Sequence, residues 1–183
     1  LLVYKVDAEH ILLVVNAANH AKDAQWIQEH LQGDVVFEDI SDKVAQVALQ
    51  GPRSLEIIRK ICNESELPTK YYTFVPRMQV AGKECLVSRT GYTGEFGYEI
   101  YCAPQDAPAI WNALLENGKD EGLLPCGLGC RDTLRFEAGM PLYGHEMDET
   151  ITPLEAGLGF CVKMKKPDFI GKFLIGTLAG IIC

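Results

Sequence analysis

One short segment of this 183-residue sequence carries side chains suited to holding a flat polar ligand: residues 89–101, RTGYTGEFGYEIY. Its glycines recur at every third position, a spacing that permits positive φ and a close approach of a ligand to the backbone. The tyrosine rings beside them, Tyr92 among them, suit a slot for a flat heterocycle. Taken alone, the glycine pattern is also compatible with a loose hairpin loop between two strands.

Glu99 stands third in the apolar run GYEIYC. A carboxylate in such a run must be paired or must bind donors, because uncompensated burial costs several kcal/mol. Its two oxygens match a ligand edge with two adjacent N–H donors, such as the edge of a pterin or a guanine, through a charge-assisted bidentate pair. The sequence therefore predicts that Glu99 binds such an edge.

A second group of charged side chains lies on a helix expected over about 128–138, within CGLGCRDTLRFEAGMPLYGHEMDET. Helical spacing places Arg131, Leu134, Arg135 and Ala138 along one stripe and turns Asp132 elsewhere. Two guanidinium groups on one stripe suit a ligand that bears a carboxylate, or an acidic partner. For Arg135 we favour a local ion pair with Asp132 or Glu137.

Composition excludes several classes of function. The net charge of −8, with its Lys and Arg residues scattered, argues against a nucleic-acid surface. The seven cysteines form no CxxC pair, and the CxxxC spacing of Cys126 and Cys130 has no second pair to complete a zinc site. We therefore expect no metal, and free thiols in a reducing compartment. No G-x-G-x-x-G or Walker loop opens a helix, so a nucleotide-binding fold has no support.

Hydrophobic periodicity predicts short strands interleaved with helices. Strands are expected in LLVYKV, HILLVVNA, VAQVALQ, GYEIYC and on both sides of a turn at Gly82-Lys83. Helices are expected over about 20–33, over 51–62 with Leu55, Ile58 and Cys62 inward, over 105–117 and over 128–138. This order predicts an α+β fold with antiparallel sheets and helices packed on one side.

The two ends of the sequence suggest a piece of a larger protein. LLVYKV already reads as a strand and lacks an initiator Met or a signal peptide. The final FLIGTLAGIIC is apolar but far shorter than the roughly 20 residues that span a bilayer. We expect no membrane anchor.

Both motifs together resemble the aminomethyltransferase, or T-protein, family of the glycine cleavage system. VSRTGYTGEFGYEIY is followed by LGCRDTLRFEAGMPLYGHEMDETITPLEAGLGF, and LLVVNAAN and ALQGP precede them in matching order, so the resemblance covers roughly residues 1–172. It implies transfer of the one-carbon unit of an aminomethyl group, carried on the lipoyl arm of H-protein, to tetrahydrofolate with release of ammonia. It further implies a ferredoxin-like folate-binding region.

The resemblance also implies roles for individual residues. Glu99 looks like the pterin-binding glutamate, Tyr92 like a ring lining the folate site, Arg131 like the arginine beside the substrate, and Tyr4 and Asn16 like positions along the pocket floor. The family's essential aspartate stands immediately before the strand that begins here at Leu1, so the catalytic acid–base group is expected upstream and none is assigned within the chain.

By the same resemblance, residues 1–80 form the first half of the folate-binding domain, residues 81–172 a second, ferredoxin-like half, and residues 173–183 an atypical apolar tail where the family continues towards a C-terminal β-barrel. The 183 residues alone are expected to bind folate weakly at most and to lack transfer. Two alternatives stay open: a folate-binding module without catalysis, or the folate-binding part of a sarcosine or dimethylglycine oxidase. The expected location is the bacterial cytoplasm, or the mitochondrial matrix in a eukaryote.

Overall fold

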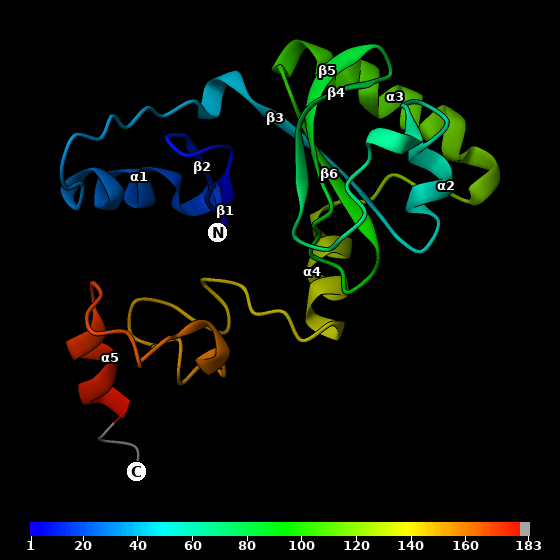
Figure 1. The fold of residues 1–183 in the computed structure, drawn as a ribbon. Helices are drawn as coiled ribbons and strands as arrows, with labels where there is room; N and C mark the ends of the chain where they lie inside the picture. Colours follow the sequence, from blue (N-terminus) through cyan, green and yellow to red (C-terminus); the bar gives the residue numbers. More distant parts are fainter. Residues whose placement is uncertain (180–183) are drawn as a thin grey trace. The chain divides into compact units, whose positions relative to one another are not determined.

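The computed structural model describes residues 1–179 of the chain, which divide into two compact units (Figure 1). The first unit comprises Leu1–Gly91 and Glu95–Pro125, and the second comprises Tyr92–Gly94 and the described residues from Cys126 onward. The short 3₁₀ helices are Ala17–Asn19, Ser41–Lys43, Glu64–Glu66, Pro104–Asp106, Lys119–Glu121 and Gly159–Cys161.

The first unit opens with a hairpin and a helix, as the sequence predicts. Strands β1 (Leu2–Lys5) and β2 (Ile11–Val14) pair antiparallel, and α1 (His20–Glu29) follows. The turn between the strands is held by Asp7, whose Oδ1 accepts from the backbone N–H groups of Glu9 and His10 at 2.8 Å. An aspartate that bonds its neighbours' backbone in this way is a common turn former.

A four-stranded antiparallel sheet forms the centre of the first unit. Its order is β3 (Ala45–Gln50), β6 (Gly97–Cys102), β5 (Lys83–Ser88) and β4 (Phe74–Val80). The β4–β5 turn is made by Ala81 and Gly82, both at positive φ, one residue before the predicted position. The predicted domain boundary at residue 80 falls within this hairpin.

One face of the sheet forms the hydrophobic core with two helices, α2 (Ser54–Ile58) and α3 (Ala107–Gly118), which lie on the same side of the sheet in Figure 1. The expectation that Leu55 faces inward is wrong: Leu55 is 37% exposed, whereas Ile57 and Ile58 are buried. The inward stripe of this five-residue helix begins at Ser54 and continues at the positions three and four residues later. The predicted α+β class, with an antiparallel sheet and helices, is confirmed.

The other face of the sheet carries polar side chains at alternating positions. All six residues of β6 are buried, and because successive side chains in a strand point to opposite faces, Ile100 enters the core while Glu99 and Tyr101 lie on the opposite side. This polar face is where the predicted ligand-binding carboxylate sits.

The second unit has little regular structure apart from α4 (Leu128–Glu137) and α5 (Lys172–Ala179). Gly139 at φ 68° ends α4, as the sequence predicts. Met140 N–H donates to the carbonyl of Arg135 at 2.9 Å and so begins the loop that follows.

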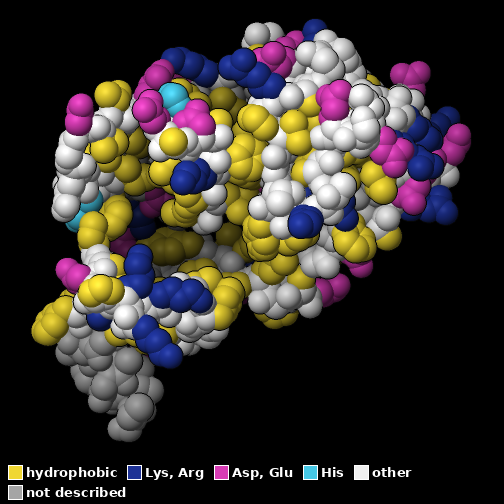
Figure 2. Space-filling view, in the orientation of Figure 1, with side chains coloured by type: hydrophobic (Ala, Val, Ile, Leu, Met, Phe, Trp, Pro, Cys, Tyr) yellow, Lys and Arg dark blue, Asp and Glu magenta, His cyan; other side chains and the backbone are white. Residues whose placement is uncertain are grey.

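Among residues 1–179, no helix has both the length and the apolar character needed to cross a bilayer. The same residues bring no three His, Cys, Asp or Glu side chains into an arrangement that could hold a metal ion. On the face shown in Figure 2, Lys and Arg side chains stand in several separate groups with Asp and Glu between them.

Candidate functional site

Glu99 lies in the middle of the sheet, on a strand with neighbours on both sides. It pairs with Ala48 of β3 and with Ser88 of β5, and it is only 6% exposed. The burial expected from its apolar surroundings is therefore present. A carboxylate in this position requires donors from its own chain or from a ligand.

The chain supplies a donor to each oxygen of the Glu99 carboxylate. Gln46 Nε2 donates to Oε1 at 2.7 Å, and the Thr90 hydroxyl donates to Oε2. The Tyr101 hydroxyl lies 3.4 Å from Oε2, beyond the usual range of an O–H···O bond. Because a carboxylate offers about four acceptor positions, each oxygen retains one for a further donor. The group can still accept a two-donor edge.

Tyr4, a predicted pocket residue, reaches this face from β1. Its ring packs edge-on against Phe74 at 4.9 Å between centroids, and its hydroxyl lies 3.2 Å from that of Tyr101. Burial raises the pKa of Tyr101, so its phenol stays neutral at physiological pH. The structure thus brings Tyr4 and Glu99, which lie 95 residues apart in the numbering, to one polar cluster.

Asn16, also predicted to line the pocket, lies after β2 at the start of the turn Ala17–Asn19. Its side chain is exposed and makes no capping hydrogen bond there. Its role stays a prediction.

The second unit brings together the other two predicted residues. The Arg131 guanidinium lies over the Tyr92 ring at 4.8 Å from the centroid, and the Tyr92 hydroxyl donates to the carbonyl of Pro141. A cation on an aromatic face is stabilised by the ring quadrupole, which orders both side chains. Burial raises the pKa of Tyr92, so its hydroxyl remains a donor.

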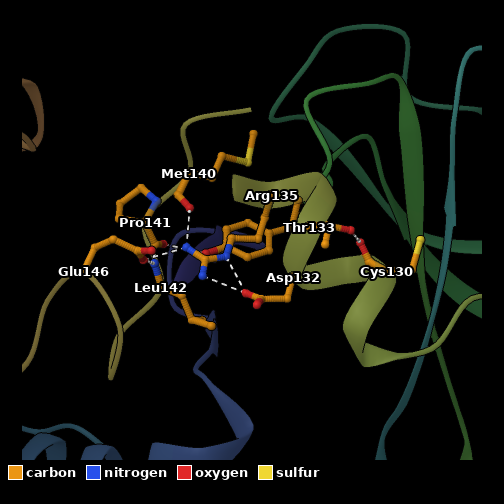
Figure 3. Close-up of polar contacts among 9 residues, drawn as sticks. Cys130, Asp132, Thr133, Arg135, Met140, Pro141, Leu142 and Glu146 are labelled. Carbon is orange, nitrogen blue, oxygen red and sulfur yellow. Dashed lines mark hydrogen bonds and ion pairs between the residues drawn. The ribbon is translucent and has the colours of Figure 1, made fainter. Parts of the chain in front are cut away.

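Arg135 forms the local ion pair that we expect from the sequence, so its guanidinium is not available to a ligand. It is 2% exposed, and its Nε and Nη2 contact Asp132 Oδ1 at 2.8 and 2.7 Å (Figure 3). The expectation that Asp132 turns elsewhere is wrong, since residues three apart on a helix are neighbours. The second acidic partner is Glu146, at 2.6 Å from Nη1, rather than Glu137.

Positive φ, which the sequence predicts for the glycines of the 89–101 segment, is found at one of the three. Of Gly91, Gly94 and Gly97, only Gly94 has a positive φ, of 76°. A Cβ at Gly91 or Gly97 would lie 1.9 or 2.3 Å from Gln50 Oε1. These two glycines therefore make room for the Gln50 side chain, whose amide donates to the carbonyls of Thr90 and Tyr98.

Sequence reasoning missed Gln46 and Thr90, the donors to Glu99. A signal for Gln46 exists in β3, AQVALQ, where Gln46, Ala48 and Gln50 alternate with the buried Val47 and Leu49. That period of two marks a polar face. Its partner across the sheet depends on strand pairing, which the sequence does not show.

An antiparallel sheet with helices on one face and a buried carboxylate among polar side chains on the other defines an α+β domain with a candidate ligand site. Comparison with known proteins gives its family: residues 1–166 match the GCVT N-terminal domain, and the chain belongs to this family.

Relatives and a solved structure agree with that assignment. The chain is 54% identical over 176 residues to the aminomethyltransferase of Anoxybacillus flavithermus and 56% identical over 174 residues to that of Clostridium botulinum. It covers 48% and 47% of these two proteins, against 96% and 94% of its own length. The crystal structure of glycine cleavage system aminomethyltransferase T from Bartonella henselae superposes with a TM-score of 0.70 at 29% identity, over 92% of this chain and 46% of that one. The chain thus spans about half the length of the relatives it matches.

Proposed function

We propose that this chain forms the folate-binding part of an aminomethyltransferase. The reaction transfers the one-carbon unit of the lipoyl-bound aminomethyl group on H-protein to tetrahydrofolate and releases ammonia. The observation that carries the proposal is the Glu99 carboxylate, buried at 6% exposure with an acceptor position left on each oxygen. The N3–H and 2-amino group of a pterin present two donors with matching spacing.

The remaining residues have roles in orienting the folate. In the first unit, Glu99 holds the pterin edge, and Tyr4 and Asn16 keep the places along the pocket floor that the resemblance implies. For Tyr92 and Arg131, which belong to the second unit, we keep the roles that the resemblance implies, a ring for the folate and an arginine for the substrate. When N5 of tetrahydrofolate is held facing the aminomethyl carbon, the transfer becomes a nearly unimolecular step. This proximity contributes much of the rate, because the two reactants no longer have to meet in solution. We assign no acid–base group within the chain; the resemblance assigns that role to an aspartate upstream of Leu1.

The proposed partners are lipoylated H-protein and tetrahydrofolate, the latter as a substrate, without a metal. Both relatives described above are named aminomethyltransferase, which favours transfer chemistry over a folate-binding part of an oxidase. Since those relatives are bacterial, we propose the bacterial cytoplasm as the location.

Substitution of Glu99 tests the proposal. Glu99→Gln exchanges one acceptor oxygen for a donor and loses a charge-assisted bond worth about 1.5–3 kcal/mol, so tetrahydrofolate affinity should fall roughly ten- to hundredfold. Calorimetric titration would be done on the 183-residue chain and on the longest reading frame that contains it. Glu84→Gln is the matched control, because Glu84 is exposed on the neighbouring strand β5.

Equal affinities of Glu99→Gln and wild type would show that Glu99 does not bind the pterin. Transfer itself is measured as ammonia release from aminomethylated H-protein in the presence of tetrahydrofolate. A longest reading frame that binds tetrahydrofolate but releases no ammonia would favour a binding module over an enzyme.

A further inference from the structure

Four hydroxyl groups are buried together beside Glu99 on the polar face of the sheet. They belong to Tyr4, Ser88, Thr90 and Tyr101, which are 5%, 0%, 2% and 6% exposed. A buried hydroxyl costs free energy unless it is hydrogen-bonded, whereas an apolar side chain of the same shape would not. The cluster therefore calls for an explanation beyond packing.

Hydrogen bonding gives three of these hydroxyls a single direction. Thr90 donates to Glu99 Oε2, and a hydroxyl has one hydrogen to donate, so the hydrogen of Thr90 is used in this bond. In the Ser88–Thr90 contact of 2.9 Å, Ser88 must then be the donor. The Tyr4 hydroxyl in turn donates to Ser88 Oγ at 3.0 Å.

The result is a directed relay, Tyr4 to Ser88 to Thr90 to Glu99, in which each hydroxyl both donates and, after the first, accepts. Bonds in such chains polarise one another and strengthen the last one. The relay begins on β1 and ends on β6, so it fastens the hairpin to the sheet at the carboxylate.

We propose that Thr90 is a positioning residue for Glu99, held in place by Ser88 and Tyr4 through this relay. The inference rests on the proposed function, in which Glu99 binds the pterin edge. Thr90 occupies one acceptor position of Oε2 and fixes the carboxylate rotation, so that the remaining positions are ready for two ligand donors. Because a preorganised fork loses less freedom on binding, Thr90 raises affinity specifically for ligands that use both oxygens.

Thr90→Val tests the inference, since valine keeps the shape of threonine and removes the donor. We expect tetrahydrofolate affinity to fall about tenfold, as for loss of a hydrogen bond to a charged group. Thr90→Ser, which restores the hydroxyl, should bind within about threefold of wild type on the same scale. Ser88→Ala, which breaks the relay one step earlier, should give a smaller loss than Thr90→Val.

A second ligand separates positioning from simple structural support. An analogue of tetrahydrofolate whose 2-amino group is replaced by methyl cannot use both carboxylate oxygens, so Thr90→Val should change its affinity by less than about threefold. An equal loss for both ligands would mean that Thr90 only supports the fold. If Thr90→Val lowered the affinity for neither ligand, the inference about Thr90 would be overturned. A loss of tetrahydrofolate affinity in Glu99→Gln would in that case still uphold the proposed function.

A measurement without ligand covers the case in which binding is too weak to titrate. The Gln46 side-chain amide donates to the other oxygen of Glu99, so its NMR resonances report the carboxylate's orientation. They should shift in Thr90→Val and return in Thr90→Ser, with the backbone amides of β3 unchanged. Gln46 resonances that stay at the wild-type position in Thr90→Val would overturn the relay independently of any folate.

Discussion

At the scale of single residues, the two arginines of α4 differ in what they can offer a ligand. Arg135 forms ion pairs with the carboxylates of Asp132 and Glu146, and the bond to Glu146 raises the pKa of the guanidinium above its ordinary value. Its charge is therefore already paired within the chain. Arg131 is exposed and lies on the Tyr92 ring. Of the two, Arg131 is the better candidate to meet an anionic group of a substrate.

Replacement of Arg131 by lysine tests that role. Lysine keeps the charge but lacks the planar fork and stacks less well on a ring, so Arg131→Lys should lower tetrahydrofolate affinity about two- to fivefold. Arg77→Lys on the exposed part of β4 is the matched control. Binding by Arg131→Lys equal to that of the control would mean that Arg131 does not contribute to tetrahydrofolate binding.

At the scale of elements, Arg135 ties the loop after α4 to the helix. Its Nη1 donates to the carbonyl of Met140 at 3.2 Å and to Glu146 Oε2, which also accepts from the Leu142 N–H at 2.8 Å. Pro141, whose carbonyl receives the Tyr92 hydroxyl, lies between these two anchored residues. The loop is held on both sides of the atom that orients Tyr92.

Loss of the Glu146 charge should loosen this loop. We expect Glu146→Gln to speed hydrogen exchange of the Leu142 amide several-fold, because the charge-assisted bonds to Arg135 and Leu142 weaken together. The internal reference is the backbone amide of Ala138, directly after α4, which donates to the carbonyl of Leu134. Unchanged exchange at Leu142 would contradict the anchoring role.

Lowering the pH should weaken the same contacts of Glu146 with Arg135 and Leu142. The bond from the Leu142 N–H, and then the bond from Arg135, hold the pKa of Glu146 below its ordinary value of 4.5. A lowered folded-state pKa means that the stabilisation is complete above about pH 4.5 and is lost as the pH falls through the folded value. In wild type, Leu142 exchange, corrected for its intrinsic pH dependence, should rise below pH 4.5, and in Glu146→Gln this rise should be absent.

At the scale of the whole molecule, the polar face depends on the apolar face behind it. Ile100 is fully buried in the core, one residue from Glu99 on the same strand, and contacts the layer formed by α2 and α3. Any shift of β6 would move both faces, since side chains of one strand share a backbone.

Truncation of Ile100 should therefore destabilise the first unit. Ile100→Ala is expected to lower the free energy of unfolding by about 2–5 kcal/mol, the usual range for a large side chain removed from a core. Trp26 and Trp111 both lie in the first unit, so tryptophan fluorescence in a denaturant titration follows that unit alone. Val36→Ala, at a site 92% exposed, is the control and should change little. An equally small change in the free energy of unfolding for Ile100→Ala would mean that Ile100 is not part of the core.

Local patterns in the sequence were sufficient for the elements and for the central carboxylate. Alternation and helical spacing depend on near neighbours, which is why the strands, the main helices and the α+β class were predictable. Glu99 could be singled out because its surroundings in GYEIYC are apolar, and burial of an ionised group always demands donors. The ion pair of Arg135 with Asp132 also follows from spacing along one helix.

Only the tertiary structure decided which groups meet that carboxylate. Gln46 reaches it because β3 pairs with β6, and Tyr4 joins the cluster because the β1–β2 hairpin contacts the polar face. Glu146 contacts Arg135 from an irregular loop, and such a loop has no hydrophobic periodicity from which the contact could be predicted. Such contacts join residues distant in the chain, and they are selected by the packing of the whole fold rather than by any local preference, so the sequence pattern carries no direct sign of them.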